Sequence, residues 1–574
     1  MGASEQGRGK IPDFEQIVER EGPVPQTRKL TVLAQDPSIT ADGEIVTAEV
    51  SVPAEVLEPG PRGARLHVVD YDAATGTLAL PVVIGDTDPF AGGTPDIEAH
   101  AFRAQNVYAI AARTLAMFEE GLGRRVPWAF GGHQLFLVPR AFPELNAYYS
   151  PEDGAIFFGY LPLDGGGEIQ TCLSHDVVAH ETTHAVLDGL RPRLAEPGLP
   201  DQPAFHEALA DIVALLSVFS LTGVVARLLG KPDAQGRLKR RLLTEDALRR
   251  SALFALAEEL GTETRGERGS GLRRSIDLPH SDAWKADPAF QEAHRRGEVL
   301  VAAVLSTLLK MWTSRLEALT SARGADAARV AEEGSKSAYH LLHMLVRGID
   351  YMPPIELEFE DVVDAIVKAD EIVAPDDPHD YRGALRAAFS EFGIVPDPDR
   401  IVDLSRGESP VYERMNYALL RSDPDEVFRF VWDNAPVFGI DRRYRLHVDS
   451  VRPSMRVGPN GLVVAEVVAD YVQSLELTAA ELGRKGVSLP AGIEPGTQLQ
   501  VWGGGVLVFD QFGRAKLHQA KRLDDWGRQA ERIAYLYERG LFTSKDRLGF
   551  RLAVPRGRLF AAMHVADSHA GEDW

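Results

Sequence analysis

Two histidines four residues apart, with a glutamate directly after the first, are the pattern in this sequence that most suggests chemistry. They are His180, Glu181 and His184 in the stretch HDVVAHETTHAVLDGL. Residues at positions i and i+4 share one face of a helix, so both imidazoles could bind one metal ion. Glu181 would then lie beside the ion without binding it, where it could accept a proton from a metal-activated water. Two buried, hydrogen-bonded histidines have the same spacing, so this stretch alone leaves both interpretations open.

A single helix is predicted around this motif, from residue 175 to 188. Ser174 is a suitable N-cap and Asp176 suits the first turn, whereas Gly189 and Pro192 mark the end. The apolar residues on the same stripe as the two histidines are Leu173, Val177 and Leu187. The histidines should therefore point into the protein.

A third metal ligand is offered by Glu207, which lies 23 residues after His184 in FHEALADIVALL. The apolar residues after it have the spacing of a buried helix, and Asp211 lies one turn beyond Glu207 on the same side. Two carboxylates on a core helix are costly unless they meet cations, and a solvated acidic face fits poorly with so apolar a helix. The sequence therefore predicts zinc bound by His180, His184 and Glu207. Asp211 would accept the free ring N–H of a ligand histidine.

These two motifs resemble those of the thermolysin-like gluzincin peptidases, which carry HExxH on one helix and the third-ligand glutamate, in ExxxD, on the next. Residues 146–160 (NAYYSPEDGAIFFGY) resemble that family's substrate-binding edge strand. HVVDYDAATGTLALP is similar to its N-terminal β region, IEAHAFRAQNVYAIAA to its first long helix, and residues 352–394 to its closing helices. The resemblance covers about residues 25–394.

The resemblance implies roles for residues outside the ligand set. Glu181 would be the general base, while Asn146 and the carbonyl of Ala147 would hold the substrate backbone. Val177 would partly line an apolar S1′ pocket. His294 would stabilise the oxyanion, and His280 is the other candidate for this role. Either histidine could instead be an ordinary surface residue.

An arginine that binds the substrate carbonyl would be Arg273 or Arg274 in GLRRSIDLP, unless this is an ordinary charged loop.

The sequence departs from the family pattern in two respects. The stretch RPRLAEPGLPDQPAF between the two helices contains no tyrosine, although the family places its oxyanion tyrosine there. Asp176 matches a ligand of the family's paired calcium site, but IVALLSVFSLTGVVARLL has no carboxylate, so this calcium site should be absent.

Composition limits the classes of partner. Among 574 residues, 84 are acidic and 62 are basic, giving a net charge of −22 that disfavours nonspecific binding to nucleic acid or to an anionic membrane. The only cysteine is Cys172, and the first residues lack the apolar core of a signal peptide, so a cytoplasmic location is expected. The apolar stretch 208–230 carries Asp211 and Arg227, and a buried core helix with a turn at Gly223 is favoured over a membrane span.

The fold class expected is α+β. The resemblance implies a thermolysin-like peptidase of two lobes, to which the chain adds a C-terminal domain. Strands are predicted between residues 29 and 84, and a helix from about 97 to 120. The predicted domains are an N-terminal β-rich region (1–95), a zinc-site lobe (96–230), a helical lobe (231–394) and a mixed C-terminal domain (395–574). In the last of these, several strands and one helix are expected, without a chemical constellation.

The function expected is that of a zinc-dependent endopeptidase that uses a metal-activated water and prefers a hydrophobic residue at P1′. A peptide or protein would be its partner, and the oligomeric state is not indicated. One alternative is a catalytically weak or inactive gluzincin scaffold that binds a peptide or protein, with residues 395–574 as the recognition module. Another is a narrowly specific intracellular processing peptidase whose C-terminal domain restricts access.

Overall fold

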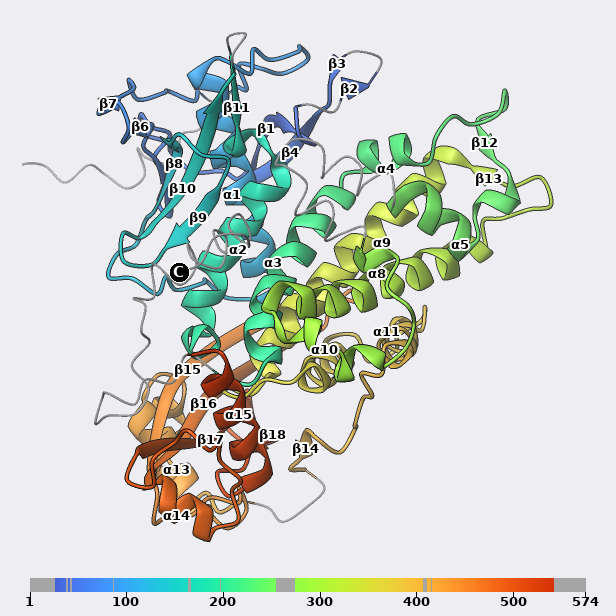
Figure 1. The fold of residues 1–574 in the computed structure, drawn as a ribbon. Coiled ribbons are helices and arrows are strands. Elements are labelled where there is room, and N and C mark those ends of the chain that lie inside the picture. Colours follow the sequence, from blue (N-terminus) through green and yellow to red (C-terminus); the bar gives the residue numbers. More distant parts are fainter. Residues whose placement is uncertain are drawn as a thin grey trace, which may run out of the picture.

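The chain folds into a mixed α+β structure with several sheets and a large group of central helices (Figure 1). The computed structural model describes residues 26–37, 40–41, 44–85, 87–163, 167–196, 198–253, 274–405, 410–413 and 415–540. The N-terminal sheets lie at one end of the molecule, the C-terminal sheet lies at the other, and the helices lie between them (Figure 1).

The N-terminal part contains short strands and one long helix. Its elements are β1 (Thr27–Leu33), β2 (Thr40–Ala41), β3 (Glu44–Ile45), β4 (Thr47–Pro53), β5 (Leu66–Val68), β6 (Tyr71–Asp72), β7 (Thr77–Leu78), α1 (His100–Leu122), β8 (Leu135–Phe142), β9 (Ala147–Ser150), β10 (Ala155–Pro162) and β11 (Glu168–Gln170). The main sheet has the order β11-β10-β8-β5, and β9 pairs with β10. The predicted strands and long helix are confirmed, with the helix starting at His100 rather than at 97.

Two helices that pack against each other, joined by a short connection, carry the HExxH motif and Glu207. They are α2 (His175–Leu190) and α3 (Asp201–Phe219), with a 3-10 turn, η3 (Pro192–Ala195), between them. The predicted helix at 175–188 is confirmed. Ser174 occupies the N-cap position, but its hydroxyl donates to Asp36 Oδ2 (2.6 Å) instead of capping the helix. Gly189 lies inside α2, where it lets the helix pass close to the carbonyl of Pro127.

The apolar stretch after Glu207 is bent rather than straight. Helix α3 and helix α4 (Thr222–Leu228) meet at an angle of 86°. The predicted turn at Gly223 is wrong, because the break falls at Ser220 and Leu221 and Gly223 lies within α4. The hydroxyl of Ser220 donates to the carbonyl of Ser217 (2.7 Å), and Leu221 has extended backbone angles, so the helical ladder ends there.

Helices continue to residue 391. The elements are α5 (Glu245–Leu248), α8 (Ala293–Glu317), α9 (Ala327–Gly348), α10 (Phe359–Val373) and α11 (Tyr381–Glu391), with a small strand pair, β12 (Arg237–Leu238) and β13 (Ala325–Asp326). By length and composition α8 could cross a membrane, and so could α3 with α4 as a bent pair. In α8, 78% of the most apolar window is buried, which is the burial expected of a core helix.

The last described part of the chain, residues 402–538, is named the C-terminal unit here. It comprises β14 (Val402–Asp403), α12 (Tyr417–Leu420), α13 (Pro424–Asp433), β15 (Arg445–Val457), β16 (Val463–Thr478), α14 (Ala479–Arg484), β17 (Gln498–Asp510), β18 (Ala515–Lys521) and α15 (Trp526–Glu538). The strands form an antiparallel sheet of order β14-β18-β17-β16-β15. The sheet and the final helix predicted for this region are confirmed.

Both faces of this sheet are covered. Successive side chains of a strand point to opposite faces. On β16, Val467, Ala469 and Tyr471 pack into the unit's own core with α13. Val468 belongs instead to the large core of the central helices, together with Val506, Val508 and Leu517 of the neighbouring strands. The C-terminal unit therefore shares a hydrophobic core with the helices that carry the HExxH motif.

The close approach at Gly189 gives a first prediction. A Cβ at this position would lie 1.9 Å from the carbonyl oxygen of Pro127, so Gly189→Ala should lower the free energy of unfolding by about 2 kcal/mol. A Cβ at Gly223 in α4 would meet nothing within 4 Å, and Gly223→Ala should raise the free energy of unfolding by about 0.5 kcal/mol. Urea titrations of both variants test this. Equal stability of the two variants would contradict it.

A second prediction concerns acid stability. His518 is buried in the C-terminal unit beside Phe438, with Nε2 2.7 Å from the hydroxyl of Tyr471. Burial lowers the pKa of His518 to about 4, so the folded chain keeps it neutral while the unfolded chain protonates it near pH 6.5. The stability that this provides is present above pH 6.5 and is lost as the pH falls towards 4.

His518→Gln should therefore reduce the pH dependence of the unfolding free energy between pH 4.5 and 6 by about 1.4 kcal/mol per pH unit. Denaturant titrations across this range measure the slope. The exposed His133 supplies the control variant His133→Gln, which should keep the slope of the wild type. An unchanged slope for His518→Gln would show that this imidazole is not held neutral by burial.

Candidate metal centre

The packing of α2 against α3 brings His180, His184 and Glu207 together. One ligand atom from each lies within 4.8 Å of the others, and all three residues are buried. The two Nε2 atoms are 2.9 Å apart, and Glu207 Oε2 lies 3.9 Å from that of His180 and 3.6 Å from that of His184. The three ligands predicted from spacing therefore converge from two helices.

This donor set fits a metal ion. Ligands that bind a tetrahedral ion at 2.0–2.1 Å are roughly 3.3 Å from one another, close to the separations found here. Glu207 is 1% exposed, and a buried carboxylate needs a cation nearby. The buried group of His180, His184 and Glu207 could hold a metal ion.

The outer nitrogen of His180 is held by a carboxylate. His180 Nδ1 lies 2.9 Å from Asp211 Oδ1, and Asp211 is one turn after Glu207 on α3. A carboxylate accepts, so Nδ1 carries the proton and Nε2 presents its lone pair to the cluster. Asp211 therefore lies against the outer nitrogen of one of the two motif histidines, His180.

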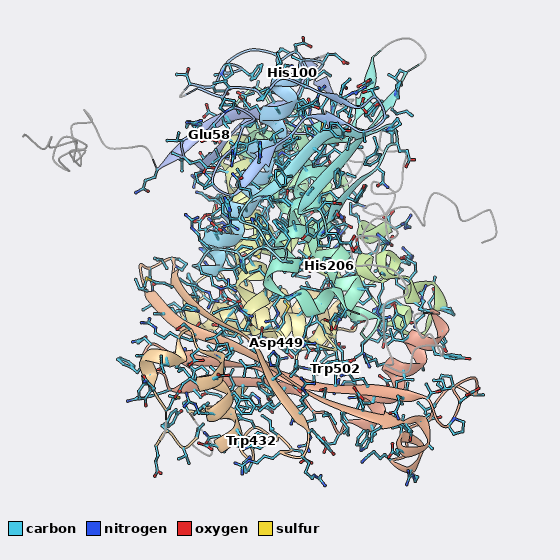
Figure 2. The ribbon with its side chains drawn as sticks, turned by 90° about the vertical axis from the view of Figure 1, so that its left-hand side faces the viewer. Glu58, His100, His206, Trp432, Asp449 and Trp502 are labelled. Atoms are coloured by element: carbon cyan, nitrogen blue, oxygen red, sulfur yellow. The ribbon has the colours of Figure 1, made fainter. Side chains whose placement is uncertain are left out.

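The outer nitrogen of His184 has a different partner, one that the sequence pattern did not predict. His184 Nδ1 lies 2.9 Å from Nδ1 of His206, and the two rings are stacked at 4.9 Å. His206 is buried in the middle of the molecule, below the N-terminal sheets (Figure 2). A polar residue directly before Glu207 on a very apolar helix was the available signal, but consecutive residues of a helix lie on different faces, so the pattern did not link His206 to the metal ligands.

His294 also reaches the cluster. It lies in the first turn of α8, with Nε2 3.3 Å from Glu207 Oε2 and Nδ1 3.1 Å from Glu292 Oε1. Burial alone would lower the pKa of His294, but the carboxylates of Glu207 and Glu292 raise it well above the ordinary value. Its rival His280 lies elsewhere, against Glu391 (3.3 Å) and the ring of Phe392.

The remaining candidates on the helical side differ in their surroundings. Glu181 is fully buried and directly follows His180 on α2. Val177 is 3% exposed within the core below the N-terminal sheet. Arg274 pairs with Glu298 of α8 (2.6 Å), and half of its side chain is exposed. Arg273 lies outside the described residues.

The predicted edge strand is β9, which pairs with one side of β10 from Ala147 to Ser150. Tyr149 joins it to α2, because its hydroxyl lies 3.2 Å from Asp188 Oδ2. Asn146 precedes β9, and its side-chain oxygen accepts from the N–H of Ala147 (2.8 Å). A largely apolar hollow of about 350 Å³ lies beside Asn146, lined in part by Phe142, Tyr148 and Phe157.

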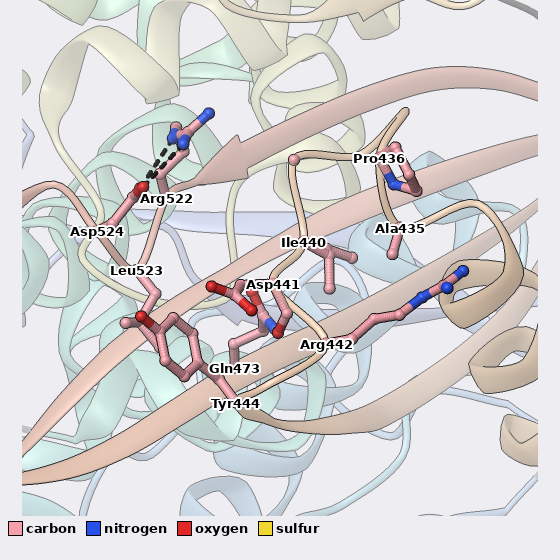
Figure 3. Close-up of a pocket in the computed structure, with 11 residues that line it drawn as sticks. Ala435, Pro436, Ile440, Asp441, Arg442, Tyr444, Gln473, Arg522, Leu523 and Asp524 are labelled. Carbon is pink, nitrogen blue, oxygen red and sulfur yellow. Dashed lines mark hydrogen bonds and ion pairs between the residues drawn. The ribbon is translucent and has the colours of Figure 1, made fainter.

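A second hollow, of about 440 Å³, lies in the C-terminal unit (Figure 3). It is formed by the loops around residues 435–444 and 522–524, with Gln473 from β16. Arg522 and Asp524 form an ion pair at 2.8 Å on one side of it. None of the residues that line this hollow is a histidine or a cysteine, so its lining resembles a polar binding surface rather than a metal site.

A scan against models of known protein families finds no match to this chain, and a search of curated proteins finds no relative. The functional inference therefore rests on the chemistry of the site.

The contact between the rings of His184 and His206 gives a third prediction. His206→Leu removes the partner that orients His184, so the affinity for zinc should fall about 10- to 100-fold, whereas His206→Asn keeps a hydrogen-bonding group and should lose less. Competition with a chromogenic chelator measures the affinity. Zinc binding by His206→Leu as tight as that of the wild type would mean that His206 does not orient the ligand.

Proposed function

We propose that this chain is a zinc-dependent endopeptidase with a thermolysin-like arrangement of an N-terminal β-rich lobe and a helical lobe, extended by the C-terminal unit. The observation that carries the proposal is the convergence of His180, His184 and Glu207, with the buried Glu181 directly after His180 on α2. Two imidazoles and one carboxylate form a ligand set typical of catalytic zinc, which keeps a fourth position open.

Glu181 is suited to move a proton in peptide hydrolysis. Bound zinc would supply a Lewis acid for water and the scissile carbonyl. On α2, Glu181 lies next to a ligand without being part of the ligand set. Its carboxylate would accept the proton of the attacking water and pass it to the leaving amine.

His294 and Arg274 are suited to stabilise negative charge on the substrate. His294 lies beside Glu207 with its Nδ1 against Glu292, so its Nε2–H could donate a hydrogen bond to a developing oxyanion. Arg274 lies near the start of α8, where it forms an ion pair with Glu298, and would bind the substrate carbonyl.

An extended peptide is the substrate that suits the surroundings of the metal centre. The edge strand β9 lies beside α2, and the side chain of Asn146 and the carbonyl of Ala147 would bind the backbone of a peptide. Val177 on α2 would favour a hydrophobic residue at P1′. A peptide or protein is therefore the proposed partner, with neither nucleic acid nor membrane involved, and the proposed location is the cytoplasm.

A catalytically weak or inactive scaffold that binds a peptide or protein is the second candidate. The absence of a tyrosine from residues 191–205 favours it, because one expected stabiliser of the transition state is missing. The hollow in the C-terminal unit would then serve recognition (Figure 3). The presence of both Glu181 and all three ligands favours the enzyme.

A fourth prediction separates the two. Glu181→Gln should lower the rate of peptide hydrolysis at least about 100-fold while zinc stays bound, because the amide cannot accept the proton. A library of quenched fluorescent peptides measures the rate, and a chelator should abolish the wild-type activity until zinc is restored. The exposed Glu317 at the end of α8 provides the control variant Glu317→Gln, which should cleave like the wild type.

Equal hydrolysis by wild type and Glu181→Gln would exclude the proposed mechanism. Tight zinc binding without cleavage of any peptide in the library would support the binding scaffold instead.

A further inference from the structure

The connection between the two metal-site helices begins with residues 191–196, named the linker here. Its first residue, Arg191, follows α2, and the backbone N–H of Arg191 donates to the carbonyl of Leu187 (2.8 Å). Its buried guanidinium binds both carboxylate oxygens of Asp470 through Nη1 (3.0 and 3.1 Å) and donates to the carbonyl of Met352 through Nη2. The end of α2 is therefore tied to β16 of the C-terminal unit.

Asp470 belongs to a buried set of charges at this contact. It also accepts from Arg452 and from the hydroxyl of Ser450 (3.0 Å). Burial would raise the pKa of Asp470, but Arg191 and Arg452 hold it below the ordinary value. A carboxylate that stays ionised at 4% exposure gives Arg191 a fixed, dry partner.

Asp350 lies at the same contact and links the central helices to the sheet. Its Oδ1 forms an ion pair with Nη2 of Arg124 (2.6 Å), just after the first long helix. Its Oδ2 forms another with Nη2 of Arg456 (2.6 Å) on β15. Arg456 also binds Glu466 of β16 (2.8 Å). Ion pairs therefore cross from the helices to two strands of the C-terminal unit.

The linker has a second anchor two residues further on. The guanidinium of Arg193 binds Asp449 of β15, with Nη2 3.1 Å from Oδ1, and lies 5.1 Å from the ring centre of Trp502. Asp449 and Trp502 lie where the C-terminal sheet meets the central helices, whereas Trp432 lies on the far side of the sheet (Figure 2).

The same segment is joined to the start of α3. The side-chain amide of Gln202 donates to the carbonyls of Arg193 (3.2 Å) and Glu196 (2.6 Å). His184 lies two helical turns before Arg191, and Glu207 lies five residues after Gln202. The position of the linker therefore sets how far α3 is offset along α2, and with it the distance from Glu207 to the two histidines.

We propose that the C-terminal unit is a positioning part of the metal centre: Asp470 and Asp449 hold the linker through Arg191 and Arg193, and thereby fix Glu207 relative to His180 and His184. This role deepens the proposed peptidase function and differs from that of a separate recognition module. Asp470, Asp449 and the two arginines are positioning residues, since they act through the helices and touch no ligand atom.

The test uses the full chain and two properties of the metal centre that need no peptide. Asp470→Asn removes the charge that holds Arg191 while keeping the side chain's shape. It should weaken zinc binding about 10- to 100-fold and change the visible absorption spectrum of the cobalt-substituted protein, because the ligand geometry changes. Asp449→Asn, at an anchor that is one-fifth exposed, should act in the same direction with a loss of about threefold to tenfold.

Two controls separate positioning from stability. Asp441→Asn makes the same substitution in an exposed ion pair with Arg443 within the C-terminal unit, and should leave zinc affinity and spectrum unchanged. Val448→Ala weakens the unit's own core on the face away from the linker, and should lower the melting temperature without changing the cobalt spectrum.

A folded Asp470→Asn variant with the wild-type spectrum and affinity would overturn the proposal, as would an equal loss of affinity in Val448→Ala. If Asp470→Asn does not fold, Asp449→Asn decides by the same two measurements. A wild type that binds zinc and shows these effects but cleaves no peptide would support the positioning role and exclude the peptidase. A wild type that cleaves peptides, together with Asp470→Asn and Asp449→Asn variants of unchanged zinc affinity and cobalt spectrum, would support the peptidase and exclude the positioning role.

Discussion

A buried carboxylate must be met by positive charge, and Glu207 is the carboxylate on which the central helices of this molecule depend. Three imidazoles, those of His180, His184 and His294, converge on its Oε2 from two other helices. Each imidazole is in turn held from behind by a further polar group, on α3 or at the start of α8. The helices can keep this packing only if the negative charge of Glu207 is balanced. A divalent cation would balance it without protonation of the histidines.

The same rule governs the other end of α2. The contact between the central helices and the C-terminal sheet includes buried ion pairs of Arg191 and Arg452 with Asp470 and of Arg456 with Asp350 and Glu466. Breaking one partner of such a set leaves an uncompensated charge, whereas apolar contacts alone would tolerate sliding. Val468 and its neighbours bury area, and the ion pairs fix the register in which that area is buried. Ligands that lie on two helices can bind one metal ion only if the two helices keep a fixed offset. Ion pairs with defined geometry fix this offset better than apolar contacts between the helices and the sheet.

Local sequence patterns predicted the parts of the site that lie within one helix. The spacing of His180 and His184 is a property of helical periodicity, and Glu207 followed from the apolar face of the next helix. His206 was missed because its contact depends on how two helices pack. Arg191 and Asp470 are 279 residues apart, and no local pattern links them. One signal was present: GLVVAEVVADYV is apolar on both faces of a strand except for two acids, which is typical of a sheet covered on both sides.

The docked linker also bears on the missing tyrosine. Residues 191–196 use their two arginines to hold the C-terminal unit, and Gln202 at the start of α3 secures their carbonyls. This segment is thus a structural joint whose two arginines are engaged by acids of the C-terminal unit. If the site hydrolyses peptides, contacts to a developing oxyanion must come from the opposite side, where α8 presents His294 and Glu298 holds Arg274. Because this joint is used to stabilise the ligand geometry, the residues that stabilise the transition state would have to come from α8 and from the segment before it.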